Sequence, residues 1–293
     1  MSQKDLTHYY EDGNILIEIH ETVFLIHQGK LCEYSSVFRD MFDIPENRIN
    51  LISPEDIKRI ELHDDLVVFT VLLDVIYQRV EVAHIDVKEQ VQLALLANKY
   101  GMDTIQSECQ SYLISLLPNS ITSRDFHLAH SYEDDPSISP LVIRAGELLH
   151  MPEVLPWAVY FYAIQSKALL EPLSEENVVF RDSRVLQLAE IRTINGQAIE
   201  YWNRSFKRFI RGYCSAEWWD DEDECWRRSE ILDTNKSLFT LSGDVENPLR
   251  DIHAAVDTWS PELCSLCADD LTAYANDIMA RVLGRIGRDV LRL

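Results

Sequence analysis

The chain has 293 residues, of which 46% are hydrophobic and 10% aromatic, with only 9 Gly and 10 Pro, so it is globular and long low-complexity regions are excluded. Asp and Glu outnumber Lys and Arg by 49 to 27, and the resulting net charge of −22 disfavours binding to nucleic-acid phosphates and to anionic membranes. No segment approaches the roughly 18 consecutive apolar residues of a membrane span, and no targeting signal is visible. We therefore expect an intracellular protein, in the cytoplasm or nucleus, with reduced or metal-bound cysteines.

The first strand signals lie close to the N-terminus. Ile15–Ile19 and Thr22–Ile26 are both rich in β-branched residues and are separated by His20 and Glu21. This pattern predicts a β-hairpin, although the two turn residues are not a strongly preferred pair. A third strand is predicted over residues 57–62.

Helical periodicity begins after the hairpin. Ser35 and Ser36 can cap a short helix that Pro45 ends. Residues 66–77 are apolar all round, and the length of the run favours a buried helix over a strand. Two further helix faces lie within residues 87–98 and 105–116, and Gly101 between them is a helix stop signal.

Strand signals disappear after Pro118. Helices are predicted near residues 121–131, 138–149, 153–170, 184–211 and 262–292. Residues 204–211 form a basic segment that could bind nucleic acid despite the overall charge, but a solvated helix face is the favoured interpretation. The expected fold class is therefore α+β, with a small mixed sheet flanked by helices followed by an all-α C-terminal region.

One ordered set of residues resembles a known family. The set is Phe24-x-x-His27-x-x-x-Leu31-x-x-x-Ser35-Ser36-x-Phe38-x-x-Met41-Phe42, followed by Ile76-Tyr77 and Leu95-x-x-Asn98-Lys99-Tyr100-Gly101-Met102. It is similar to the signature of BTB/POZ domains. The resemblance implies a BTB/POZ domain over residues 13–117 and leaves a helical C-terminal domain over residues 118–293.

The resemblance also predicts the roles of several side chains. His27 can donate a hydrogen bond from one ring nitrogen and accept one at the other, which would tie the strand end to the following helix. The apolar signature residues are expected in the core, namely Leu31, Phe38, Met41 and Phe42.

The C-terminal half resembles that of BTB proteins from mushroom-type fungi. Those proteins append a helical half of this length and carry a cysteine pair near the C-terminus, as in Cys264-x-x-Cys267. They often finish with a Trp-x-x-Leu-Pro tail, which residues 285–293 do not contain.

No arrangement of residues predicts catalysis. The sequence contains no Gly-rich phosphate loop, no Gly-x-Ser-x-Gly elbow and no His-Glu-x-x-His motif. His127 and His130 have a spacing that suits a metal on one helix face, but two exposed polar residues are the favoured interpretation. An uncharacterised enzyme around these residues stays open as an alternative function.

Four cysteines form the candidate metal site. Cys264 and Cys267 lie one helical turn apart, which is a chelating spacing, and Cys214 and Cys225 could supply two further thiolates. The sequence therefore offers a possible structural zinc site, with four unligated thiols as the alternative.

The BTB resemblance implies a non-enzymatic protein–protein interaction module or adaptor. Its partners would be a second copy, a cullin-type ubiquitin-ligase scaffold or a transcriptional partner, without nucleic acid or membrane. The short segment before Gly13 disfavours a dimer that exchanges strands. The alternatives are an enzyme or a structural scaffold whose site lies in the helical half.

Overall fold

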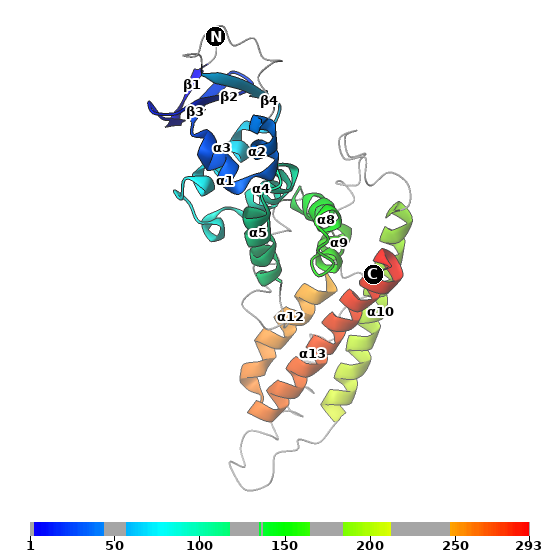
Figure 1. The fold of residues 1–293 in the computed structure, drawn as a ribbon. Helices are drawn as coiled ribbons and strands as arrows, with labels where there is room; N and C mark the ends of the chain where they lie inside the picture. The colour runs from blue at the N-terminus through cyan, green and yellow to red at the C-terminus, as the bar shows by residue number, and fades with distance from the viewer. Residues whose placement is uncertain are drawn as a thin grey trace. The chain divides into compact units, whose positions relative to one another are not determined.

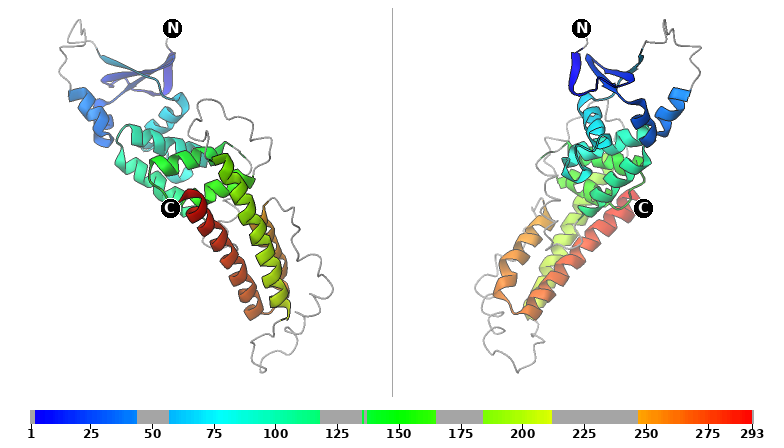
Figure 2. Two further views of the ribbon diagram at one scale, coloured as in Figure 1. Left: turned by 90° about the vertical axis from the view of Figure 1, so that its right-hand side faces the viewer. Right: turned by 60° about the vertical axis from the view of Figure 1, so that its left-hand side comes forward.

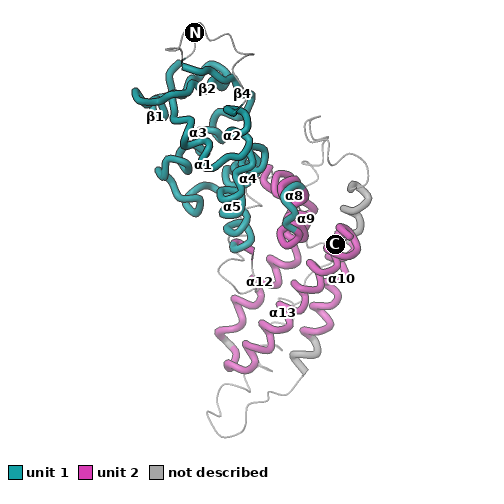
Figure 3. The backbone as a smooth tube through the Cα atoms, viewed as in Figure 1, with its two compact units in different colours: residues 1–115, 148–151 teal, residues 116–147, 152–293 magenta. Residues whose placement is uncertain are grey.

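The computed structural model describes residues 3–43, 57–117, 135, 137–164, 184–211 and 247–292, apart from the side chains of 184–190, 192, 207–211 and 262. The chain divides into two compact units (Figure 3). Unit 1 contains residues 1–115 and 148–151, and unit 2 contains residues 116–147 and 152–293. The α+β fold class predicted from the sequence is confirmed, because no strand occurs in the described residues beyond position 117.

Unit 1 is built on one mixed sheet with the strand order β1-β3-β2-β4 (Figure 1). The predicted hairpin is confirmed, and His20 takes the left-handed φ of 51° at its turn. β1 runs parallel to β3, and β4 runs parallel to β2, so the hairpin occupies the centre of the sheet. The strands are β1 (Gln3–Tyr9), β2 (Ile15–Ile19), β3 (Thr22–Ile26) and β4 (Lys58–Leu62).

The helices of unit 1 lie to one side of this sheet (Figures 1 and 2). Ile15, Ile17 and Ile19 alternate along β2 and are fully buried. Phe24 on β3 packs against Phe69, with ring centroids 5.5 Å apart. The helices predicted over this part of the chain are confirmed, and they are α1 (Gln28–Tyr34), α2 (Ser36–Asp43), α3 (Leu66–Ile76), α4 (Val87–Lys99) and α5 (Asp103–Ser115).

The start of α2 is joined to the end of α4. The buried hydroxyl of Ser35 accepts a hydrogen bond from the backbone N–H of Phe38 at 2.9 Å and donates one to the carbonyl of Tyr100 at 2.5 Å. Gly101 has a φ of 58°, and a Cβ at this position would lie 2.3 Å from the Ser36 hydroxyl. The predicted cap and helix stop therefore form one contact, which only glycine fits.

All the regular secondary structure described in unit 2 is helical. α10 (Arg184–Arg211), α12 (Pro248–Trp259) and α13 (Ser265–Arg285) run side by side (Figures 1 and 2). α13 continues into a π-helical segment, η6 (Ile286–Leu291). The helices predicted near 138–149, 184–211 and 262–292 are confirmed, and the one predicted near 121–131 lies outside the described residues.

Two shorter helices complete the description of this part of the chain. α8 (Ile138–Leu148) begins in unit 2, and α9 (Leu155–Ile164) forms the described part of the helix predicted near 153–170. α12 was not predicted, although Asn247 caps it and Pro248 begins it. None of the described helices is long and apolar enough to span a membrane.

Candidate interaction surface

The outer edge of β1 carries the most exposed large apolar side chain among the described residues. Lys4 is opposite Val23, and Tyr9 is opposite Leu25. Between these two pairs β1 has four residues and β3 has one, so β1 bulges. Leu6 lies within this bulge and is 95% exposed. Because the strand order ends at β1, this bulge lies on an edge of the sheet.

The bulge is held by one carboxylate. Asp5 Oδ1 accepts hydrogen bonds from the backbone N–H groups of Thr7 at 2.9 Å and His8 at 2.6 Å. These two N–H groups are therefore occupied and cannot donate to an added strand. Leu6 is thus presented as a side chain on an ordered backbone, and the edge beside it is protected from continuous strand pairing.

His8 anchors the end of β1 to helix α3. Its imidazole is fully buried, and Nε2 lies 3.1 Å from Asp74 Oδ1. Burial lowers the pKa of His8, and the hydrogen bond and charge of Asp74 offset only part of this effect. Tyr10 adds a second contact because its ring stacks on Tyr77, with centroids 4.7 Å apart.

The structure corrects the partner predicted for His27. The residue lies at the N-cap position of α1, but its side chain makes no capping hydrogen bond. Instead, Nδ1 lies 2.9 Å from the Tyr77 hydroxyl at the end of α3, and Nε2 lies 3.3 Å from Asp12. The backbone N–H of His27 also donates to the Tyr77 hydroxyl at 3.0 Å. The side chain therefore ties the strand end to α3 rather than to the following helix.

The predicted core residues of the signature divide into two groups. Leu31 and Phe38 are fully buried, as expected. Met41 and Phe42 are half-buried, so the prediction that they lie in the core was wrong in degree. The Phe42 ring stacks on Phe38, with ring centroids 5.9 Å apart. The Lys58 ammonium lies 5.2 Å from the centroid of the Phe42 ring.

Two of the four candidate zinc ligands are described. Cys264 is the N-cap residue of α13, and Cys267 is buried in its first turn. Cys214 and Cys225 lie outside the described residues, and so do His127 and His130. Within the ranges that the structure covers, no three metal-binding side chains come together. The four-thiolate site stays a prediction.

The basic segment 204–211 forms the end of α10. Phe206 is buried and stacks on Trp202 with ring centroids 5.5 Å apart, so it faces the helical core. Arg204 is exposed, and the side chains of 207–211 lie outside the description. In its described part, the segment therefore has one buried apolar face and one solvated basic face.

The comparison with protein families agrees with the order of elements in unit 1. Residues 6–117 match the model of the BTB/POZ domain. These residues are a BTB/POZ domain. The match begins at Leu6, so the exposed Leu6 and the His8 anchor lie within the BTB domain, and Asp5 immediately precedes the matched residues. No curated protein matches the chain.

Proposed function

We propose that the protein is a non-enzymatic interaction module whose BTB domain binds a second copy of itself, with Leu6 at the centre of the contact. BTB domains generally mediate protein–protein interaction, which supports the adaptor role. The observation that carries the proposal is the 95% exposure of Leu6 on a backbone held by Asp5. Because the backbone at Leu6 is already ordered, binding through this apolar side chain would cost little further conformational entropy, which favours association.

A two-fold contact suits this surface. In a symmetric dimer the same patch lies on both copies, so each Leu6 would cover its counterpart. Because Asp5 occupies the backbone N–H groups of Thr7 and His8, the contact would use side chains rather than an added strand. His8 holds β1 against its own chain, which favours association without strand exchange.

Co-purification of two differently tagged full-length copies tests the proposal. Leu6→Asp is expected to abolish co-purification, because it places a charge at the centre of an apolar contact beside Asp5. Leu266→Asp is the matched control, since Leu266 is 45% exposed on α13 and lies outside the BTB domain. Equal recovery of the wild type and Leu6→Asp would refute the contact.

The finer alternatives concern the partner. Docking to a cullin-type scaffold or to a transcriptional partner would also fit a BTB adaptor, in the cytoplasm or nucleus. Purification of the tagged chain from cells, with identification of a bound cullin or corepressor, would distinguish them from self-association. The similarity of the helical half to BTB proteins of mushroom-type fungi and the structural zinc at Cys214, Cys225, Cys264 and Cys267 remain part of this proposal.

A further inference from the structure

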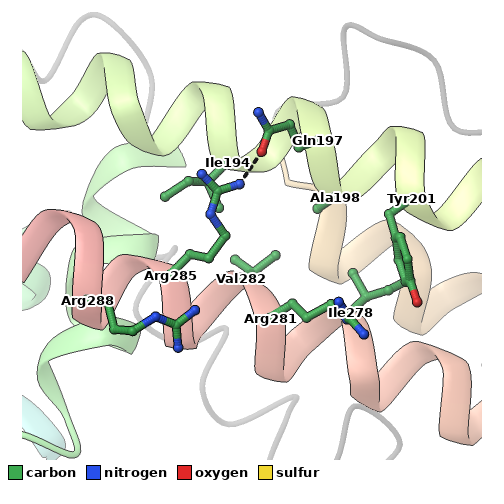
Figure 4. A pocket seen from close by; sticks show the side chains of 9 residues that line it. All are labelled: Ile194, Gln197, Ala198, Tyr201, Ile278, Arg281, Val282, Arg285 and Arg288. Atoms are coloured by element: carbon green, nitrogen blue, oxygen red, sulfur yellow. Dashed lines mark hydrogen bonds between the residues drawn. The ribbon is translucent and has the colours of Figure 1, made fainter.

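Unit 2 contains a pocket of about 260 Å³ between α10 and the α13–η6 helix (Figure 4). Three arginines line it from one face of the same helix, at positions 281, 285 and 288. Gln197 and Tyr201 line it from α10. Although the whole chain has a net charge of −22, one wall of this pocket is lined by cationic side chains.

Arg281 is oriented by two groups. Its Nε donates to Asp277 Oδ2 at 2.7 Å, and its guanidinium lies 4.8 Å from the centre of the Tyr201 ring. The Tyr201 hydroxyl donates to the same carboxylate oxygen at 3.1 Å. The terminal nitrogens of Arg281 make no hydrogen bond within the part of the chain that the structure describes, so they can donate to a ligand.

Arg285 is held from both helices. Its Nη1 donates to Gln197 Oε1, drawn as the dashed line in Figure 4, and its Nε donates to Asp289 Oδ2 at 3.1 Å. Arg288 is exposed and forms no ion pair within the described residues. The three guanidiniums therefore face only two paired carboxylates, and the pocket keeps an excess of positive charge.

The remaining wall of the pocket is apolar. Ile278 and Val282 contribute from α13, and Ile194 and Ala198 contribute from α10. All four side chains are buried or nearly so. With exposed fractions of 7% or less, these side chains offer little surface to a ligand, so the contacts of the pocket come from its polar side chains.

We propose that this pocket binds the phosphate group of a phosphate monoester. The arginines offer more N–H donors than the two oxygens of a carboxylate can accept, whereas a phosphate monoester presents three terminal oxygens and close to two negative charges. The guanidiniums of Arg281 and Arg285 are already oriented by Asp277 and Asp289, which lowers the entropy lost on binding. The ligand would be a small phosphate ester or a phosphorylated side chain of a partner protein.

The proposal is independent of self-association, because it concerns side chains of unit 2 alone. Phenyl phosphate is the probe, titrated calorimetrically into the full chain in a phosphate-free buffer at ~150 mM salt. One-to-one saturable binding is expected, and phenyl sulfate, a monoanion of similar shape, should bind more weakly. Loss of a charge-assisted hydrogen bond in Arg288→Gln should lower the affinity about ten-fold or more.

Arg204→Gln is the control for bulk charge, because Arg204 is an exposed arginine of α10 that does not line the pocket. It should leave the affinity within about two-fold of the wild type, since an exposed charge outside the site contributes little. Unchanged melting temperatures would show that both variants fold. Failure of phenyl phosphate to bind, or equal binding by wild type and Arg288→Gln, would overturn the proposal.

A phosphotyrosine peptide identifies the source of the phosphate. If the peptide binds more tightly than phenyl phosphate and loses affinity in Arg288→Gln, the site reads a phosphorylated partner. If both probes bind equally and depend equally on Arg288, the site takes a small phosphate ester. Either result supports the pocket as a phosphate site, whereas peptide binding that does not depend on Arg288 contradicts it.

Discussion

Phe38 is fully buried in the BTB domain, and its ring stacks on Tyr100 with centroids 4.6 Å apart. Phe38→Ala should lower the free energy of unfolding of this domain by about 3–5 kcal/mol, because it removes a buried ring and leaves a cavity. Chemical denaturation of the full chain measures this loss. The neighbouring Val37→Ala is the control, since Val37 is 41% exposed and should lose far less.

His8 makes the stability of the BTB domain depend on pH. Burial lowers its pKa below the ordinary value of 6.5, so the unfolded chain takes up a proton more readily than the folded chain. The stability that neutral His8 contributes is therefore present above about pH 6.5 and is lost as the pH falls below this value.

A substitution isolates this effect from the other titrating groups. His8→Asn cannot be protonated, so its melting temperature should fall less between pH 7 and pH 5 than that of the wild type. Thermal unfolding of both proteins across this interval gives the comparison. Parallel curves would show that His8 does not titrate differently in the folded and unfolded states.

At the scale of elements, Tyr160 joins two helices of unit 2. Its hydroxyl donates to Asn247 Oδ1 at 2.7 Å and accepts from the backbone N–H of Leu249 at 3.1 Å, both at the start of α12. Tyr160 itself is fully buried on α9. A side chain of another helix therefore provides hydrogen-bond partners for polar groups at the N-terminus of α12.

Tyr160→Phe should lower the stability of unit 2 by about 1–3 kcal/mol, because it leaves a buried N–H group and a buried amide oxygen with one partner fewer. Denaturation monitored by circular dichroism of the helices measures the change. Tyr34→Phe provides the comparison, since no hydrogen bond of the Tyr34 hydroxyl occurs in the described chain. Equal stability of the two variants would contradict the role of Tyr160.

Helices and the central hairpin could be predicted because their periodicity is local. The alternation of Ile15, Ile17 and Ile19 and the apolar run of α3 both identify buried elements. β1 could not be predicted in this way, because Gln3, Lys4 and other polar residues dominate it, and it becomes a strand through pairing with β3. Tertiary contact overrides propensity at this edge.

The candidate sites were harder to predict than the fold. Leu6 has no motif, and its exposure depends on a bulge that requires the register of β1 against β3. Arg281, Arg285 and Arg288 have a helical spacing that was visible in the sequence, but their pocket depends on Gln197 and Tyr201, which lie about eighty residues earlier. The spacing of residues along a helix shows which side chains share a face, but only the fold shows which residues of another helix lie opposite that face.

At the scale of the whole molecule, the net charge of −22 limits the partners. No saturable binding to a DNA or RNA duplex is expected at submicromolar protein and ~150 mM salt, because the acidic surface repels the phosphate backbone. Fluorescence anisotropy with a labelled duplex tests this expectation. Binding that survives this salt concentration would show that a local basic surface overcomes the overall charge.

Self-association through the BTB domain is the central claim, and sedimentation equilibrium of the full chain tests it most directly. The wild type should approach twice the 34.0 kDa mass of one chain as its concentration rises through the micromolar range, whereas Leu6→Asp should remain at 34.0 kDa. A wild-type protein that stays at 34.0 kDa throughout, or a Leu6→Asp variant that associates as the wild type does, would contradict the claim.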